Sequence, residues 1–364
     1  MHCKVSLTIL LFFSALGAQA QTPEYSEHIS RTFPISSFMT VDIANKYGRI
    51  QVIPWDKDSV QFNIEKRIRA KDAQKLEKLK RNVEFEFTPG QYYVLVRTKF
   101  GDGGSDMIKD IVDIAGSYLS SSNSVTINYT VMVPPRVALK IENKFGDVYF
   151  DDLDGSLSLI LSYGNMKADR LDGRSEIKLT SGDCEINYVK DGQLDVSYGN
   201  VHITDAGKLL AQTRSSNVSI DKAISLKLDT RRDKIYLNSV ASLSGNSYFS
   251  GINLVSLQND LSFVCRYGNL TVNSIRRSFS MIDISSEFTD LALAFEKPAS
   301  FTMELTHHQD VQFIYPRAIS SLSTKVLDAE NKLFTTSGTF GTGSPEAEVV
   351  IKATRKCSVT ISQR

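Results

Sequence analysis

Three arginines recur at one position of an internal repeat and are suited to bind an anion. Counting from the glycine of each repeat, the position two residues earlier carries Arg214, Arg231 and Arg266. Guanidinium groups donate in a planar fork that matches carboxylate and phosphate oxygens. Stacked repeats would align them into a basic stripe for an acidic glycan or a phosphate. The alternative is a solvated face of mixed charge, because three nearby residues interrupt or neutralise the stripe: Tyr248, Asp229 and Asp233.

A row of aromatic side chains immediately precedes the glycine position. It comprises Phe145, Tyr163, Tyr198, Phe249 and Tyr267. Exposed aromatic rings can stack on sugar rings, whereas rings stacked along a repeat also stabilise the fold. The row is broken by Ser181, Ser215 and Arg232. The sequence does not choose between sugar binding and stabilisation of the fold. Tyr163, Tyr198 and Tyr267 are the candidate contact residues.

The remaining chemistry-bearing residues do not form a catalytic, cofactor or metal motif. His307 and His308 would point to opposite faces of a strand, so they could not easily share a metal. The alternative is one half-buried and one exposed histidine. Outward carboxylates such as Glu185 and Asp195 occur singly, and neither a GxSxG, a Walker loop nor a CxxC is present. We therefore expect no catalytic residue, cofactor or metal.

These candidates belong to a phrase that returns every 17 or 18 residues between Asn143 and Val272. Clear copies are NKFGDVYF, LSYGNMKA, LTSGDCEI, VSYGNVHI and CRYGNLTV. Apolar residues recur two, four and seven positions after the glycine, with polar residues between the first two. One such strand cannot bury its apolar face alone, but stacked copies share a continuous core. The sequence predicts an all-β, parallel β-solenoid, right-handed as parallel crossovers usually are.

Two further columns concern the corners of each coil. The glycine is expected at a corner that needs unusual backbone angles. Five residues later, Asp or Asn recurs, as at Asp151, Asp169, Asn187 and Asp221. A calcium ladder is one interpretation of this column. A row of structural turns is the other, because Asp and Asn side chains bond to nearby backbone in turns.

The two ends of the chain depart from the repeat. Residues 1–20 resemble a secretory signal peptide, with Lys4, an apolar run and Ala18-Gln19-Ala20. Residues 21–135 are expected to form a first coil with an inserted cap of strands, a helix and a hairpin. Its flexible 101–124 piece holds a helical pattern over 107–119. Residues 136–364 form the solenoid, with a closing coil near 349–361.

Charge and cysteine content narrow the function classes. The formal net charge is +1 and falls to zero if Lys4 is removed, so nothing predicts nucleic-acid binding. Cys184, Cys265 and Cys357 are too few and too widely spaced for a disulfide framework. No run is long enough for a transmembrane helix. We expect export to the periplasm or the cell surface.

The phrases NKYGRIQVIPW, NKFGDVYF, SYGNMKADRLDG and SYGNVHI resemble the bacterial putative-adhesin family. The resemblance spans about Ile43 to Ile361 and implies a secreted β-solenoid. It does not name a ligand. We therefore expect a non-catalytic binding or structural role with a cell-envelope protein or a glycan as partner. The alternative is a polysaccharide lyase or hydrolase, since such enzymes also use parallel β-helices.

Overall fold

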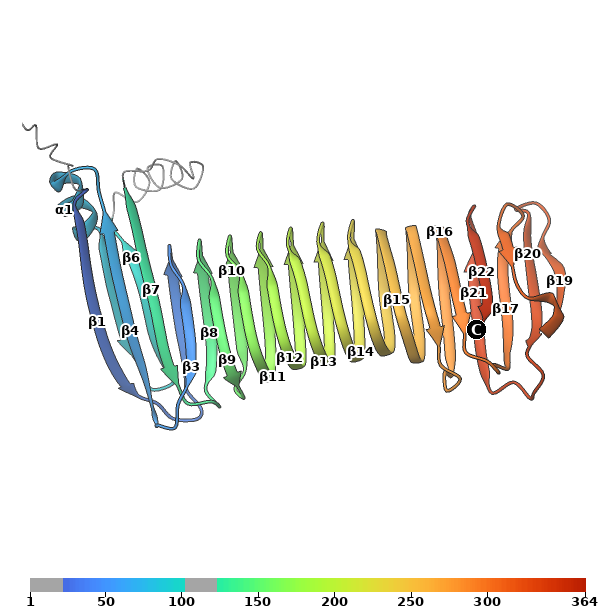
Figure 1. Ribbon diagram of the computed structural model, residues 1–364, viewed down its shortest axis with the longest axis horizontal. Helices are drawn as coiled ribbons and strands as arrows, with labels where there is room; N and C mark the ends of the chain where they lie inside the picture. Colours follow the sequence, from blue (N-terminus) through green and yellow to red (C-terminus); the bar gives the residue numbers. More distant parts are fainter. Residues whose placement is uncertain (1–21, 102–122) are drawn as a thin grey trace, which may run out of the picture.

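The protein is an elongated rod crossed by β-strands along its whole length (Figure 1). The computed structural model describes residues 22–101 and 123–364. The predicted signal peptide and the predicted 107–119 helix lie outside these residues. Within them, no helix is long and apolar enough to cross a membrane.

The middle of the rod is a solenoid of two parallel sheets. Its strands are β8 (Ala138–Lys144), β9 (Val148–Leu153), β10 (Leu157–Ser162), β11 (Met166–Thr180), β12 (Cys184–Ser197), β13 (Asn200–Arg214), β14 (Asn217–Arg231) and β15 (Lys234–Ile275). From β11 onward each long strand belongs to both sheets. The first part of β11 pairs with β9 and its last part pairs with β10, both in parallel. The predicted β-solenoid is confirmed.

The apolar columns of the repeat form the core between the two sheets. Every residue two, four and seven positions after the glycine, from Val148 to Ile275, is buried. Ile203 and Ile220 are directly paired on neighbouring coils, and their exposed fractions are 0% and 1%. The alternation arises because neighbouring side chains of a strand point to opposite faces. The repeat alignment made from the sequence is therefore correct.

Glycine recurs at this position for a different physical reason from the one expected. The left-handed backbone belongs to the residue before it, as at Tyr163 with φ 57°. Gly164 is needed because of space: a Cβ there would lie 2.2 Å from the carbonyl oxygen of Gly146. Gly268, with φ 155°, is the copy that also needs glycine for its backbone angle. Each glycine thus lets one corner lie directly against the corner before it.

Three successive corners replace the glycine with a polar side chain. Ser216, Asp233 and Ser250 are buried at this position. The Ser216 hydroxyl donates to the carbonyl of Arg214 at 2.9 Å, and that of Ser250 donates to the carbonyl of Tyr248 at 3.2 Å. These corners therefore satisfy their polar groups internally.

The Asp and Asn column lies at a bend inside each strand. Asp169 is absent from the β11 ladder register, and both Asp169 and Arg170 are exposed before Leu171 returns to the core. The Asn187 amide donates to Asp169 at 3.0 Å. Across the described residues, no group of three His, Cys, Asp or Glu side chains could hold a metal ion. The contacts of Asp169 fit the structural interpretation of this column, and the choice between structural turns and a calcium ladder stays a prediction.

The N-terminal end extends both sheets, first through parallel pairs and then through antiparallel ones. Its elements are β1 (Glu24–Pro34), β2 (Thr40–Lys46), β3 (Ile50–Pro54), β4 (Ser59–Arg69), α1 (Ala73–Arg81), β5 (Val83–Pro89), β6 (Tyr93–Phe100) and β7 (Ser124–Val133). One sheet continues through β3, β7, β4 and β1, and the other through β2, β6 and β5.

Helix α1 connects the two sheets at this end of the rod. Asp72 caps it by accepting from the backbone N–H of Lys75 at 2.7 Å, and Leu79 is its buried residue. The predicted strand, helix and hairpin are therefore present. The domain boundary after residue 135 stays a prediction, because strand β2 pairs with both β6 and β8.

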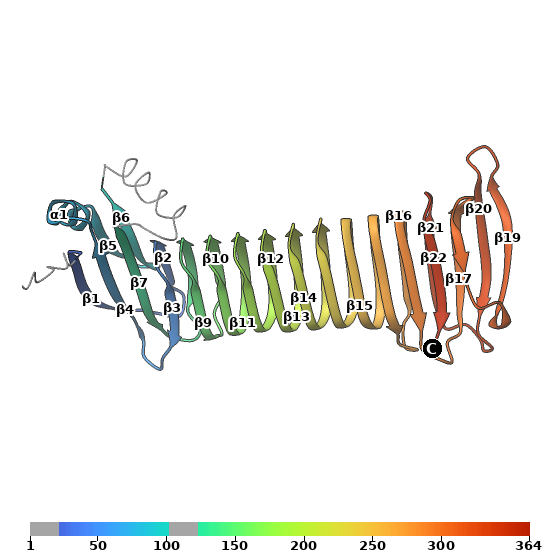
Figure 2. The same cartoon turned by 45° about the horizontal axis from the view of Figure 1, so that its top comes forward.

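At the C-terminal end, the order of the strands in space differs from their order in the sequence. Its elements are β16 (Met281–Phe295), β17 (Phe301–His308), β18 (Gln312–Ile314), the short 3-10 helix η1 (Arg317–Ile319), β19 (Ser320–Asp328), β20 (Leu333–Phe340), β21 (Ala347–Ala353) and β22 (Ser358–Gln363). Strand β21 lies between β16 and β17, and β22 lies between β16 and β18 (Figures 1 and 2).

The coil predicted near 349–361 therefore exists but does not close the rod. The hairpin of β19 and β20 covers the end instead, with β20 antiparallel to β17. Residues 320–346 do not follow the repeat, so the sequence analysis did not predict this hairpin. Pairing between distant strands decides which coil lies last, and a sequence pattern reports only neighbours along the chain.

Candidate functional site

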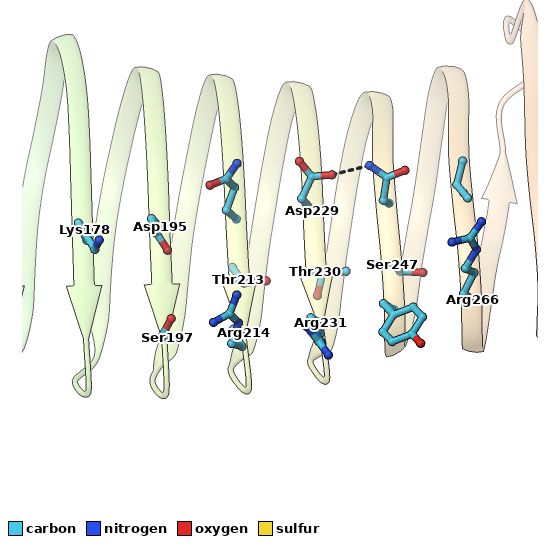
Figure 3. Close-up of a pocket in the computed structure, with 14 residues that line it drawn as sticks. Lys178, Asp195, Ser197, Thr213, Arg214, Asp229, Thr230, Arg231, Ser247 and Arg266 are labelled. Atoms are coloured by element: carbon cyan, nitrogen blue, oxygen red, sulfur yellow. Dashed lines mark hydrogen bonds between the residues drawn. The ribbon is translucent and has the colours of Figure 1, made fainter.

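The predicted arginine stripe lies in a groove on one outer face of the solenoid. Arg214, Arg231 and Arg266 all line it, and Lys178 adds a fourth basic side chain (Figure 3). The groove has a volume of about 660 Å³. The structure therefore brings the three predicted arginines together in a concave surface.

Two outward columns of neighbouring coils form the walls of this groove. One column runs, in paired register, through Lys178, Asp195, Gln212, Asp229 and Asn246. The other runs through Ser197, Arg214, Arg231 and Tyr248. Consecutive members of a column are separated by the strand spacing of about 4.8 Å. The groove thus offers a regular ladder of charged and amide groups.

Buried hydroxyl groups form the floor between the two columns. Thr213, Thr230 and Ser247 line the groove from inward-facing positions and are 5–6% exposed. Both threonine hydroxyls donate to the buried carboxylate of Asp233, which also accepts from the backbone N–H groups of Ser216 and Arg231. Sequence reasoning missed this floor. The signal was the loss of the corner glycine at three successive copies.

The ion pairs of the groove involve only one of its three arginines among the described residues. In the described part of the chain, no carboxylate lies within ion-pair distance of Arg214 or Arg231. Arg266 pairs with Glu287 at 3.6 Å, with both side chains largely exposed. Asp233 points into its hydroxyl cluster, and Asp229 accepts from the Asn246 amide at 2.7 Å. Asp229 lines the groove and Asp233 lies in its floor, but neither forms an ion pair with Arg214 or Arg231 in the described residues; neutralisation of the stripe by these acids stays a prediction.

Tyr248 interrupts the arginine column as expected, but it also contacts it. The Arg231 guanidinium carbon lies 5.6 Å from the centre of the Tyr248 ring. A cation over an aromatic face is attracted to the ring quadrupole. Tyr248 thereby helps to orient the guanidinium that faces the groove.

The aromatic row follows the corner next to the groove. Its residues share one left-handed backbone geometry, with φ between 54° and 63° from Phe145 to Tyr267. Rings on successive coils stack face to face: Phe145 on Tyr163 at 5.2 Å, and Phe249 on Tyr267 at 4.7 Å between centroids. Stacking therefore stabilises two separate segments of the row, in line with the interpretation that these rings stabilise the fold.

Exposure in this row is nevertheless high. Tyr163 is 55% exposed and Tyr198 is 60% exposed, while Tyr267 is 38% exposed. Tyr198 has no ring partner among residues 22–101 and 123–364. The candidate contact residues are thus accessible, and Tyr198 is not stacked on another ring of the described residues.

A second groove lies on the other sheet and has a less uniform charge. It has a volume of about 600 Å³ and is lined by polar side chains including Lys167, Glu185 and His202. Lys167 pairs with Glu185 at 3.0 Å, and His202 Nε2 lies 3.8 Å from Asp221. Because Lys167 and Glu185 already pair with each other, this groove is the weaker candidate for a charged ligand.

The two clustered histidines have structural contacts. His307 Nε2 lies 3.0 Å from the Thr336 hydroxyl, and its ring stacks on Phe334. His308 Nδ1 accepts from the backbone N–H of Asp310 at 3.2 Å. Both histidines are half-buried, so the expectation that one is exposed was wrong. Strand β20 covers His307, and His308 contacts its own turn.

Of the four cysteines in the sequence, the three in the described residues, Cys184, Cys265 and Cys357, are free and buried. Burial raises the pKa of the Cys184 thiol to about 12 and that of Cys265 to about 11. A thiol with a raised pKa is a poor nucleophile at neutral pH. Cys184 therefore fills the core, with its sulfur 4.0 Å from the Met166 sulfur.

Comparison with known proteins gives limited likenesses. No protein-family model matches the chain, and no curated protein matches it. Among solved structures, it is similar to "a putative cell adhesion protein" from Clostridium sporogenes, with 9% identity and a TM-score of 0.18, covering 93% of this chain and 100% of the other. It is also similar to "a putative adhesin" from Bacteroides fragilis, with 11% identity, a TM-score of 0.25, and coverage of 93% and 97%. The family resemblance of the repeat phrase stays a prediction.

Proposed function

We propose that this chain is an exported, non-catalytic binding protein whose groove binds an acidic polysaccharide. The observation that carries the proposal is the pair Arg214 and Arg231, adjacent on neighbouring coils and without a carboxylate partner in the described residues. Unpaired guanidinium groups at the wall of a groove attract carboxylate groups of a ligand. Lys178 and Arg266 extend the positive charge along the rod.

The other lining groups favour a ligand that carries hydroxyls as well as acids. Asp195 and Asp229 accept hydrogen bonds, and Gln212 and Asn246 both donate and accept. Two carboxylates in the groove would repel a densely charged polyphosphate or nucleic acid. A uronic acid polymer offers one carboxylate and several hydroxyls on each ring, so it matches this mixture better.

The repeating geometry suits a polymer better than a small molecule. Equivalent wall positions recur with each coil at about 4.8 Å, and the groove is open along the rod (Figure 3). The paired strands already fix the backbone of this ladder, so binding needs to order only its side chains. A polymer can therefore contact equivalent positions on several coils.

Titration with hexagalacturonate, a linear uronic acid oligomer, tests the proposed groove. Replacing Arg214 and Arg231 with Gln should weaken binding by at least about tenfold, since each tenfold loss corresponds to about 1.4 kcal/mol. The matched control replaces Lys208 and Lys227 with Gln, which removes two exposed positive charges outside the groove. Equal affinity of the arginine variant and the parent would contradict the proposal.

A polysaccharide hydrolase is the second candidate, and one observation favours it. Asp195 and Asp229 lie in the same column with Gln212 between them, roughly 10 Å apart at the strand spacing. Inverting glycosidases hold two carboxyl groups about 6.5–9.5 Å apart, so this separation lies at the upper limit. New reducing ends that vanish in Asp195→Asn would select this candidate over binding alone.

Export is part of the proposal and follows from residues 1–20. A signal peptide would deliver the chain to the periplasm or the cell surface. Protease treatment of intact cells distinguishes the two locations, because only a surface protein is cleaved. Recovery of the uncleaved chain in the cytosol would contradict export.

A further inference from the structure

The aromatic row contains a gap between two exposed rings. Phe145 stacks on Tyr163, but the next coil carries Ser181, and the coil after that carries Tyr198. Ser181 has the same left-handed backbone as its neighbours, with φ 58° against 57° for Tyr163 and 63° for Tyr198. The two tyrosines therefore project in the same direction, with a small side chain between them.

The width of this gap follows from the ring spacing in the filled segments. Stacked neighbours elsewhere in the row are 4.7–5.4 Å apart. Tyr163 and Tyr198 are two coils apart, so the spacing between their rings is roughly 10 Å. Both rings are more than half exposed, so the gap is open to a ligand.

This width selects the kind of ring that can occupy the gap. Carbon atoms in contact are about 3.5–4.0 Å apart, so a flat ring between two others needs only roughly 7–8 Å. A pyranose ring is puckered and carries C–H groups on both faces, which makes it thicker than a flat ring. Its C–H faces also meet the electron-rich faces of aromatic rings favourably.

We propose that Tyr163, Ser181 and Tyr198 form a subsite that holds one pyranose ring between the two tyrosines. This subsite rests on the proposed function and deepens it, because it adjoins the basic groove. The Tyr198 backbone N–H donates to the carbonyl of Arg214 at 3.0 Å. A polymer with one ring in the gap would thus present its next acidic groups to Arg214 and Arg231.

The other break in the row does not form an equivalent subsite. Between Tyr198 and Phe249 the row passes through Ser215 and Arg232, which makes the interval three coils, or roughly 14 Å. One ring cannot contact both sides of that interval, and the Arg232 side chain lies within it. The gap at Ser181 is therefore the one matched to a single ring.

Filling the gap with an aromatic side chain provides the test. Ser181→Phe would place a ring between Tyr163 and Tyr198, as Phe145 and Phe249 do at equivalent corners with φ 60° and 54°. The corner thus accepts phenylalanine, and the variant should fold. The matched control is Ser215→Phe, which covers the opposite face of Tyr198 and leaves the gap open.

Hexagalacturonate is the probe, with affinity and sugar proton chemical shifts as readouts. In the parent, C–H protons of one ring should shift upfield because two aromatic faces enclose them. Ser181→Phe should abolish this shift and weaken binding by about tenfold, while Ser215→Phe keeps both. Parent-like shifts and affinity in Ser181→Phe would overturn the subsite.

The arginine variants separate failure of the subsite from failure of the groove. Loss of binding in Arg214→Gln/Arg231→Gln with full binding in Ser181→Phe overturns the subsite alone. Loss in Ser181→Phe with full binding in the arginine variant supports the subsite and overturns the groove. No binding of the parent to hexagalacturonate overturns both.

Discussion

The Thr213 hydroxyl donates to the Asp233 carboxylate at 2.7 Å in the buried floor of the basic groove. Asp233 occupies the corner position where other coils carry glycine, and it accepts four hydrogen bonds from neutral donors. A buried charge is tolerated only where such donors replace water. This cluster therefore fixes the corner beneath Arg214 and Arg231.

Asp233→Asn should destabilise the protein by about 1–3 kcal/mol, because the amide nitrogen cannot accept from these donors. Thermal or urea unfolding measures the loss. Asp191→Asn is the control, since Asp191 is exposed on strand β12 and should change stability by less than about 0.5 kcal/mol. Equal loss in both variants would show that the cluster has no special role.

Ile220→Asp should cost about 3 kcal/mol or more, because it buries a charge without a partner. Ile224→Asp is a close control on the same strand, where the parent side chain is 62% exposed. Urea denaturation of the two variants compares the same chemical change inside and outside the core. An Ile220→Asp protein as stable as the control would contradict the core column.

Gly164→Ala should destabilise the corner by about 1–3 kcal/mol, because its Cβ would overlap the Gly146 carbonyl. Gly343→Ala should have little effect, since the nearest atoms to its Cβ lie 3.8 Å away in Ser300. Melting temperatures of the two alanine variants measure the difference. A melting temperature of Gly164→Ala equal to that of the parent would mean that the corner can relax.

Deletion of residues 347–364 should unfold the C-terminal end, because β21 and β22 pair with strands on both sides. Unpaired strand edges associate with other chains, so the deletion should also promote aggregation. Light scattering and limited proteolysis would detect both effects. Deleting residues 22–34 is the comparison: within the described residues β1 pairs only with β4, and the coils beyond it should stay protected.

Stability should fall above about pH 9, because burial raises the pKa of Cys184 to about 12. Below the unfolded-state pKa both states keep the proton, so the thiol has no effect. Above it the unfolded chain loses the proton while the folded chain retains it, which costs about 1.4 kcal/mol per pH unit. Urea unfolding at pH 8 and pH 10 should show that the Cys184→Ala variant loses less stability over this range than the parent.

The apolar columns illustrate what a sequence repeat can determine. Ile203 and Ile220 were placed side by side from spacing alone, and the structure pairs them. Such inference succeeds because strand side chains alternate and because each coil repeats the same positions. The same argument placed Arg214 next to Arg231 on the outer surface.

The glycine column shows where the pattern misleads. The sequence analysis placed glycine at the corner because glycine tolerates unusual backbone angles. In the structure, however, the left-handed angles belong to Tyr163, and Gly164 allows the close approach of the neighbouring coil. A repeat reports that a position is constrained. It does not report whether the constraint comes from backbone angles or from the neighbouring coil.

The sequence by itself determined the solenoid, the buried columns and the alignment of the arginines and tyrosines, because these depend on spacing along the chain. Only the tertiary structure decided that the last coil lies between β16 and β17. It also decided that Arg214 and Arg231 lack carboxylate partners in the described residues while Asp233 is bonded to buried hydroxyls. Those outcomes depend on strand pairing between distant segments and on side-chain direction within a corner, neither of which a linear pattern records.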